Sequence, residues 1–213
     1  MNVIVASHNE EILVNNLMQS VFPKEVNLII MRGYDNVSKA YNEAILKTKP
    51  GFSLFIHHDV YLPDGWFKRL HEVIEYLESD KYGVIGVAGA DYHDGIVYKG
   101  NIINGGERWH HGSGDILEEV QTVDELLFLV RTIDASFDET LGNHFYCADL
   151  CLRLAAKGKK NYVMNNICSH NGTTNNVKDE NGKFVYSEDF YRARDIMAKK
   201  YTFPIATTCT TIN

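Results

Sequence analysis

The stretch SLFIHHDVYLPDGWFKRLHEVIEYLES, residues 53–79, contains a strand, a polar turn and a helix in immediate succession. It opens with a short run of four mostly apolar residues, which predicts a buried strand. Pro63 suits the first turn of a helix, and the apolar residues after it recur with a period of 3.6, which predicts a helix over 67–79. Between strand and helix stand His57, His58 and Asp59, three side chains that can bind a metal ion or take part in catalysis.

The same order of strand and helix is repeated along the first half of the chain. We expect strands at 2–6, 26–31, 53–56 and 82–90, and helices from residue 10 to about 18, at 37–46 and at 67–79. Strands that alternate with helices predict βαβ units and therefore an α/β fold with a mostly parallel central sheet flanked by helices.

The second half is less regular. Residues 91–116 contain six glycines together with Trp109, His110 and His111, which predicts an irregular Gly-rich loop region of functional kind. Further on we expect strand-like structure at 120–130, a helix at 146–158 ended by Gly158, a strand at 161–168, an irregular loop at 171–186 and a C-terminal helix at 187–201. The chain is expected to form one domain over 1–203, with 204–213 as a tail or the start of a linker to further domains.

Composition limits the function. The 213 residues carry a net charge of −7 and no block of Lys and Arg, which argues against a nucleic-acid partner. No apolar stretch approaches the ~20 residues that span a bilayer, and the N-terminus lacks the features of a signal peptide.

The four cysteines form no CxxC pair, so we expect reduced thiols in a cytoplasmic protein. A zinc site from Cys147, Cys151, Cys168, His144 and His170 is an alternative that their spacing supports poorly.

Polar side chains follow each of the first three strands. In open α/β sheets ligands bind beyond the carboxyl ends of the strands. Ser7, His8 and Asn9 follow the first strand, Arg32 follows the second, and His57, His58 and Asp59 follow the third. Strand alternation would direct His57 and Asp59 to one side and His58 to the other. An imidazole and a carboxylate together suit Mn²⁺ or Mg²⁺, and His170 is the best candidate for a third ligand.

Several motifs resemble a known family. FIHHDVYLPDGW (55–66) resembles the metal-binding segment of nucleotide-sugar glycosyltransferases of the GT-A fold, family 2 type. Asp59 matches the second acid of that family's Asp-x-Asp, and His57 stands in place of the first. FDETLGNHFYCADLCLRLAAKGKKNYVMNNICSHNG (137–172) and VASHNEE (5–11) are similar to further family motifs. SKAYNEAI (38–45) resembles the streptomycin-cluster subgroup, and the whole chain resembles the N-terminal domain of large chlorella-virus glycosyltransferases that build capsid glycans.

The resemblance implies a GT-A (Rossmann-like) fold and a transferase. It would move a hexosyl or deoxyhexosyl group from a nucleoside-diphosphate sugar, most often a UDP-sugar, to a glycan or glycoprotein acceptor, with Mn²⁺ or Mg²⁺ as cofactor. The protein would be located in the cytoplasm, or in the host cytoplasm if it is viral. The metal would be held by His57, Asp59 and His170. The nucleotide would be bound by Ser7, His8, Asn9, Arg32, Ser38, Asn42 and His58.

The chain departs from the family at its catalytic acid. Tyr146 and Cys147 stand where a Glu-Asp pair is usual, which leaves Asp149 as the nearest carboxylate and the candidate catalytic base. The missing pair motivates one alternative, a nucleotide-sugar or glycan-binding module without catalysis. A second alternative is an Fe(II) oxygenase with a His-x-Asp and distant His triad. Such sites sit on all-β folds, and the 2-oxoglutarate subclass needs an Arg soon after the last His, whereas none appears before Arg192.

Overall fold

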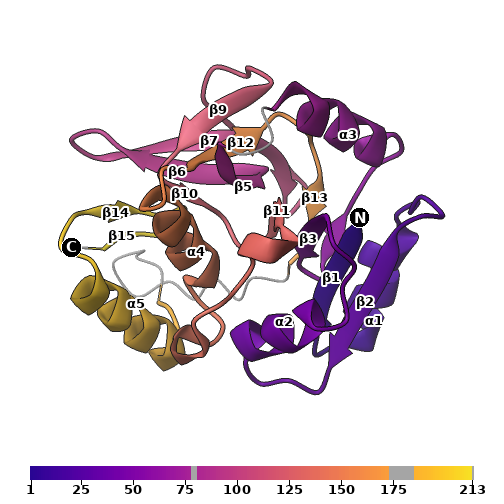
Figure 1. Cartoon of the computed structure of the whole chain (residues 1–213), viewed down its shortest axis with the longest axis horizontal. Helices are drawn as coiled ribbons and strands as arrows, with labels where there is room; N and C mark the ends of the chain where they lie inside the picture. The colour runs from indigo at the N-terminus through magenta and orange to yellow at the C-terminus, as the bar shows by residue number, and fades with distance from the viewer. Residues whose placement is uncertain (78–80, 173–184, 213) are drawn as a thin grey trace.

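The structure is a computed structural model that describes residues 1–77, 81–172 and 185–212. At its centre lies a seven-stranded sheet with the order β2-β1-β3-β11-β5-β12-β9 (Figure 1). The strands are β1 (Asn2–Ser7), β2 (Asn27–Arg32), β3 (Phe52–Ile56), β5 (Tyr82–Gly86), β9 (Leu117–Val120), β11 (Leu127–Arg131) and β12 (Lys160–Met164). Only β9 and β11 run against the direction of the other five. The predicted α/β fold with a mostly parallel central sheet flanked by helices is therefore confirmed.

Helices cover both faces of this sheet. They are α1 (Glu10–Asn15), α2 (Val37–Ile45), α3 (Trp66–Tyr76) and α4 (Tyr146–Ala155). Successive residues of a strand point to opposite faces, so Val3 and Val5 pack with α1 and α3, whereas Ile4 packs with α2 and α4. These core side chains are fully buried, and each stabilises the fold by about 2 kcal/mol.

The expected strand at 82–90 is two strands in two sheets. The chain leaves β5 at Gly86 and enters β6 (Ala88–Tyr92), which belongs to the second sheet, with the order β10-β6-β7-β13-β4. A Cβ atom at Gly86 would lie 2.1 Å from a Val123 methyl, and one at Gly89 would lie 2.5 Å from the Thr122 carbonyl oxygen. The close approach at this crossing explains why the apolar run contains glycines.

The expected loop at 91–116 was a wrong prediction over most of its length. The segment forms β7 (Ile96–Asn104) and β8 (Glu107–His111), which pair as a hairpin. Gly105 and Gly106 have φ of +57° and +85° and supply the left-handed turn that a two-residue hairpin needs. Gly100 lies under the Trp109 ring, where a Cβ would come within 2.8 Å of that ring. The glycines therefore serve turns and close packing within a sheet.

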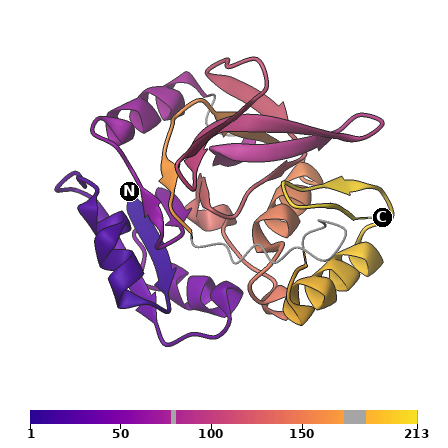
Figure 2. The same ribbon diagram turned by 180° about the vertical axis from the view of Figure 1, so that it is seen from behind.

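The C-terminal part forms a small core of its own. The predicted helix at 187–201 is confirmed as α5 (Glu188–Lys200), with Ser187 as its N-cap. Over residues 204–212, which were expected as part of a tail, β14 (Ile205–Ala206) and β15 (Thr211–Ile212) form a hairpin whose Ile205 and Ile212 are buried against α4 and α5. Figures 1 and 2 show this unit on the opposite side of the molecule from β1, β2 and α1.

Other boundaries differ by a few residues. The expected helix from residue 10 to 18 is α1 followed by the short 3₁₀ turn η1 (Leu17–Gln19). The expected helix at 67–79 begins at Trp66, and Pro63 precedes it as the acceptor of the Trp66 N–H. The apolar run 120–130 contains β10 (Thr122–Val123) and β11 as separate strands, and the strand expected at 161–168 ends at Met164. Most of the expected loop at 171–186 lies outside the described residues.

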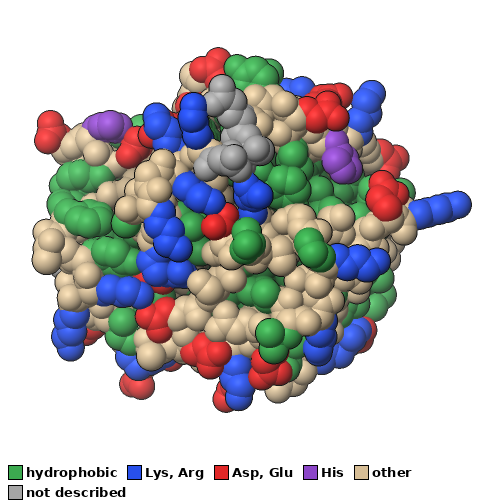
Figure 3. All heavy atoms as spheres, viewed as in Figure 1, with side chains coloured by type: hydrophobic (Ala, Val, Ile, Leu, Met, Phe, Trp, Pro, Cys, Tyr) green, Lys and Arg blue, Asp and Glu red, His purple; other side chains and the backbone are tan. Residues whose placement is uncertain are grey.

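The surface mixes both signs of charge. On the face shown in Figure 3, Lys and Arg side chains alternate with Asp and Glu side chains and with apolar ones. Among the described residues, no helix combines the length and the apolar character needed to cross a membrane.

Candidate metal and nucleotide site

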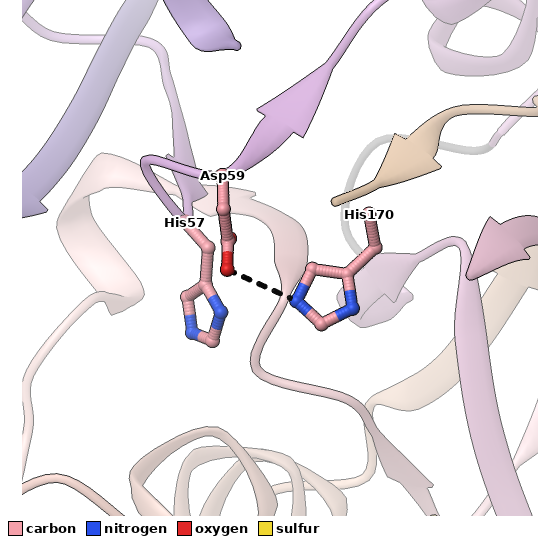
Figure 4. Close-up of side chains that lie close together, drawn as sticks. All are labelled: His57, Asp59 and His170. Atoms are coloured by element: carbon pink, nitrogen blue, oxygen red, sulfur yellow. Dashed lines mark ion pairs between the residues drawn. The ribbon is translucent and has the colours of Figure 1, made fainter. Parts of the chain in front are cut away.

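The two candidate ligands after β3 lie in a turn rather than in a strand. β3 ends at Ile56, and the next residues form a tight turn into β4 (Val60–Tyr61). The His57 N–H donates to the Leu126 carbonyl at 2.9 Å, and the Val60 N–H donates to the His57 carbonyl at 3.4 Å. Strand alternation therefore does not set the direction of these side chains, yet His57 and Asp59 converge (Figure 4).

His170 reaches the same point from a distant part of the chain. It lies on β13 (Ser169–His170), which pairs with β4 so that His170 stands opposite Val60. Its Nε2 atom is 3.5 Å from Asp59 Oδ2, as Figure 4 shows. One ligand atom from each of His57, Asp59 and His170 lies within 4.8 Å of the other two. The structure thus brings together the three residues that the sequence predicted as a group.

The charges of this group suit a cation. Burial alone would raise the pKa of Asp59, but the hydrogen bond to His170 and the nearby imidazoles lower it to about 2. Burial lowers the pKa of His57, which favours its neutral, metal-binding form. The pKa of His170 is raised, because its hydrogen bond and charge interaction with Asp59 exceed the opposing effect of burial. Asp59 Oδ1 is buried and has no hydrogen-bond partner among the described residues, so one lone-pair site is left over for a ligand.

A glycine keeps space open beside the group. The Asn171 N–H donates to the Asp59 carbonyl at 2.9 Å, which directs the next residue, Gly172, past the ligands. A Cβ atom at Gly172 would lie 2.7 Å from Asp59 Oδ2 and 3.1 Å from His170 Nε2. The side-chain-free backbone leaves room of atomic size next to two of the three ligand atoms. Sequence analysis did not single out Gly172.

Two further side chains orient the histidines. His170 Nδ1 lies 3.0 Å from Asn104 Oδ1, so an N–H at Nδ1 leaves Nε2 as the atom that faces Asp59. His57 Nε2 lies 3.3 Å from the Tyr146 hydroxyl. Asn104 comes from the end of β7 and Tyr146 from the start of α4. Neither residue is near its histidine in the sequence, which is why sequence patterns did not predict these contacts.

A cavity of about 450 Å³ opens beside the three ligands. Its size is that of a small-molecule site, and it lies beyond the carboxyl ends of β1, β2 and β3, as the sequence predicted. It is lined by Ala6, His8, Tyr34, Asp35, Val37, Tyr41, His57, His58, Asp59, Asn143 and Tyr146. Tyr34 and Asp35 were missed, although they follow β2 by only a few residues and the strand-end argument applies to them.

The residues at the end of β1 have different roles. His8 lines the cavity together with His58, which follows β3, and the two rings are 4.6 Å apart. The buried Ser7 Oγ lies 2.9 Å from His58 Nδ1 and fixes that ring. Burial lowers the pKa of His58, so the ring is an uncharged donor or acceptor. Asn9 does not reach the cavity, because its side chain caps α1 by accepting the Ile12 N–H.

Three other predicted nucleotide ligands are engaged elsewhere and do not line the cavity. Arg32 forms an exposed ion pair with Glu10 at 2.8 Å. The buried Ser38 hydroxyl donates to the Gly142 carbonyl at 2.8 Å. Asn42 exchanges hydrogen bonds with the backbone of Phe137 at 2.9 Å in both directions. Ser38 and Asn42 therefore attach α2 to the segment before α4, and their effect on the cavity is indirect.

Asp149 was expected as the base, and the structure places it differently. Its carboxylate is fully buried between α4 and α5, where it pairs with Arg153 at 2.8 Å and Lys200 at 2.6 Å and accepts from the Tyr201 hydroxyl at 2.7 Å. It lines none of the described cavities near the ligands. With both oxygens engaged by cations and a hydroxyl, Asp149 stabilises the packing of α5 and has no open path to a substrate.

The cysteines of the alternative zinc site lie in the core. Cys147, Cys151 and Cys168 are buried free thiols, and among the described residues the only group that could hold a metal ion is His57, Asp59 and His170. A larger cavity of about 600 Å³ lies at the opposite edge of the sheet, lined by Phe52, Tyr82 and Ile133 among others. It contains neither histidine nor carboxylate, so we place the chemistry at the three-ligand group.

Comparisons with known proteins agree with this placement. A family model described as "Glycosyltransferase like family" matches residues 2–201. The structure is similar to that of S. aureus TarS 1–349 in complex with UDP-GlcNAc, with a TM-score of 0.57 and 16% identity over 93% of this chain and 65% of that one. It is also similar to the mannosyltransferase PcManGT from Pyrobaculum calidifontis in complex with GDP-Man and Mn²⁺, with a TM-score of 0.52 and 12% identity over 93% and 60% of the two chains. At identities this low, the structural similarity shows a shared fold alone.

One curated relative is similar in sequence. It is the protein named "ATP synthase subunits region ORF 6" of Fuscovulum blasticum, 29% identical over 171 residues. The match covers 76% of this chain and 64% of the relative. The chain therefore spans somewhat less than two thirds of the length of the relatives that it matches.

Proposed function

Because the chain belongs to the glycosyltransferase-like family, we propose that it is a metal-dependent transferase that uses a nucleoside-diphosphate sugar as donor. The observation that carries this proposal is the convergence of His57, Asp59 and His170 at the edge of a cavity of about 450 Å³. A site of this kind at the carboxyl edge of an α/β sheet is where a nucleotide binds in such folds.

The residues present fit a divalent cation. Asp59 supplies a charged carboxylate with an unpartnered oxygen, and His57 and His170 supply imidazole nitrogens. Mixed oxygen and nitrogen ligands suit Mn²⁺, and Mg²⁺ is the alternative. Gly172 places no side chain against Asp59 and His170, so these two residues would remain accessible to a cation. When bound, the cation would stabilise the negative charge that develops on the leaving diphosphate.

The remaining cavity residues would hold the nucleoside. His8 and His58 present two adjacent imidazole rings, and Ser7 fixes the second of them. Tyr34 and Tyr41 line the cavity beside Asp35, which offers a carboxylate to sugar or base N–H and O–H groups. Burial raises the pKa of the Tyr41 hydroxyl well above its usual value, so it remains a neutral hydrogen-bonding group.

The finer features of the reaction rest on the sequence resemblance. We propose a UDP-sugar as donor, a hexosyl or deoxyhexosyl group as cargo, and a glycan or glycoprotein as acceptor. Membership of the streptomycin-cluster subgroup, a role in viral capsid glycans and a place in the cytoplasm are predictions of the same origin.

Calorimetry with UDP tests the proposal. We expect UDP to bind at least tenfold more tightly with Mn²⁺ than with EDTA, and Asp59→Ala to abolish this difference. Asp64→Ala is the matched control, because it removes an exposed carboxylate five residues along the same segment. UDP binding that is independent of Mn²⁺, or that Asp59→Ala leaves unchanged, would show that Asp59 holds no metal.

Two alternative functions can be distinguished from the proposed transferase. A binding module without catalysis is motivated by the engaged state of Asp149, and it predicts metal-dependent UDP binding with no turnover of any sugar nucleotide. An Fe(II) oxygenase shares the two-histidine, one-carboxylate ligand set. The mixed α/β sheet with helices on both faces differs from the all-β folds that usually carry such sites, and the family match lies with glycosyltransferases.

A further inference from the structure

A second, smaller cavity adjoins the proposed donor site. Its volume is about 50 Å³, and it lies among the start of α4, α5 and the β14–β15 hairpin. The segment from Asn143 to Tyr146 contributes to both cavities: Asn143 and Tyr146 line the donor cavity, and His144 and Phe145 line the smaller one. Phe145 has φ of +60°, a left-handed conformation that is costly for an aromatic residue. Such strain is common where a backbone segment shapes a functional site.

Glu125 lines this small cavity and differs from the other acids near it. Its Oε1 atom is buried and has no hydrogen-bond partner among the described residues. The neighbouring Asp124 is fully engaged, because one oxygen accepts the Leu126 N–H at 2.9 Å and the other accepts the Thr208 hydroxyl. An unpartnered buried carboxylate oxygen costs free energy, so its retention calls for a reason.

The surroundings of Glu125 favour proton exchange. Burial, and secondarily the charge of Asp124, raise its pKa well above the usual value. The backbone amides of Cys147 and Tyr146, at the start of α4, stabilise the charged form and oppose this shift. A carboxylate whose pKa is raised from the ordinary range of about 4 is a stronger base once it has lost its proton.

Glu125 is connected to the proposed metal ligands through its neighbours Leu126 and Tyr146. The next residue, Leu126, accepts the His57 N–H through its carbonyl at 2.9 Å. Tyr146 forms a second connection: its backbone amide faces the Glu125 carboxylate, and its hydroxyl lies 3.3 Å from His57 Nε2. One tyrosine therefore contacts both the Glu125 carboxylate and a candidate metal ligand.

We propose that Glu125 is the general base of the transfer and that the small cavity admits the acceptor hydroxyl. The assignment rests on the proposed function. In the reaction the acceptor O–H bond breaks and its proton passes to the Glu125 carboxylate. The acceptor oxygen forms a bond to the anomeric carbon of the donor sugar. The bond from that carbon to the diphosphate oxygen breaks, and the electron pair leaves with the diphosphate.

The test uses water as the simplest acceptor. Hydrolysis of UDP-GlcNAc, UDP-glucose and GDP-mannose is measured with Mn²⁺ for the wild type, Glu125→Gln and Glu125→Asp. We expect Glu125→Gln to lower kcat by 100-fold or more, with the Kd of UDP in Mn²⁺ changed less than threefold. We also expect its melting temperature to stay within a few degrees of the wild type, because Gln keeps the shape of Glu and an oxygen that can accept from the same backbone amides. Glu119→Gln is the control, since Glu119 pairs with Lys160 on the exposed edge strand β9.

The outcomes separate the base from the proposed function. An active wild type with Glu125→Gln within tenfold of it overturns the role of Glu125 and leaves the proposed function standing. If the wild type binds UDP with Mn²⁺ but turns over none of the donors, the proposed transferase fails, and the base fails with it. Should Glu125→Gln not fold, Glu125→Asp decides: a base set back by one methylene lowers kcat at unchanged UDP affinity, whereas wild-type kcat overturns the assignment.

Discussion

At the level of single residues, the proposed metal site depends on a glycine as well as on its three candidate ligands. We expect Gly172→Ala to weaken Mn²⁺ binding by at least tenfold, because the added methyl would lie 2.7 Å from Asp59 Oδ2. The clash falls on the ends of the Asp59 and His170 side chains and not on the core, so thermal stability in EDTA should change little. Titration calorimetry with Mn²⁺ alone measures the effect. Asn171→Ala serves as the control, since the exposed Asn171 side chain contacts only Asn16 among the described residues. Equal affinities for wild type and Gly172→Ala would mean that no cation occupies this space.

Sequence reasoning grouped the three candidate ligands, which the structure brings together, and it misplaced several of their neighbours. His57, Asp59 and His170 were predictable because each stands directly at a strand end, where few polar side chains have another task. Asn9 and Ser38 also stand near strand ends or on a facing helix, but their hydrogen-bonding groups cap α1 and attach α2. A short polar side chain suits both tasks equally well, and only the folded structure decides between them.

Glu125 and Asn104 were not predictable for a different reason. Each acts on a partner that lies far away in the chain: Asn104 is 66 residues from His170, and Glu125 precedes the start of α4 by about twenty residues. No periodicity connects such positions. Strand pairing places both residues. β7 pairs with β13, which sets Asn104 beside His170, and β11, which follows Glu125, pairs with β3, which precedes His57.

At the level of elements, the last helix is held by a network around Asp149. We expect Asp149→Asn to destabilise the protein by about 2 kcal/mol, since it leaves Lys200 and Arg153 without their shared buried partner. For a chain of this size that corresponds to a fall in Tm of about 5 °C. Asp195→Asn, on the exposed face of the same helix, should change Tm little. A stability equal to wild type would show that α5 is held by its apolar contacts alone.

A second contact of Lys200 makes the same region sensitive to acid. The hydrogen bond from the Thr140 hydroxyl, the largest cause, and the contact with Lys200 lower the pKa of Asp138 to about 2 from its usual 3.8, against the opposing effect of burial. A lowered pKa stabilises the fold above about pH 4, and this contribution is lost as the pH falls through 2. Asp138→Asn should therefore cost about 0.5 kcal/mol at neutral pH, and its difference from wild type should vanish by about pH 2. Urea unfolding across this range measures it, and a difference that stays constant with pH would contradict the assignment.

The element boundaries show what a linear pattern contains. The strands β1 to β3 and the helices α2, α4 and α5 were predicted within a few residues, because each has the period of its own structure. The apolar run from 82 to 90 gave no sign of its division at Val87, since both halves are buried. A buried strand that passes from one sheet to another has the same composition as one continuous strand.

At the level of the whole molecule, the two proposals describe one site with two approaches. The donor cavity lies against the N-terminal strands, and the smaller cavity lies against the C-terminal helix and hairpin. The segment from Asn143 to Tyr146, together with the turn that carries His57 and Asp59, stands where these two parts of the chain meet. The family match over residues 2–201 includes the N-terminal strands and the C-terminal helix, and it ends before the hairpin. A transferase needs both, because the donor and the acceptor have to meet at one carbon atom.

The position of β11 has a consequence for how the chain reaches this structure. β11 lies between β3 and β5, although both of those strands precede it by dozens of residues. Until residue 131 has left the ribosome, β3 and β5 each present an unpaired edge with fully buried side chains such as Leu54 and Ile85. Open apolar edges pair readily with other chains, and sheets that close late fold slowly. Refolding from denaturant should therefore be slow and should lose material to aggregation as the protein concentration rises.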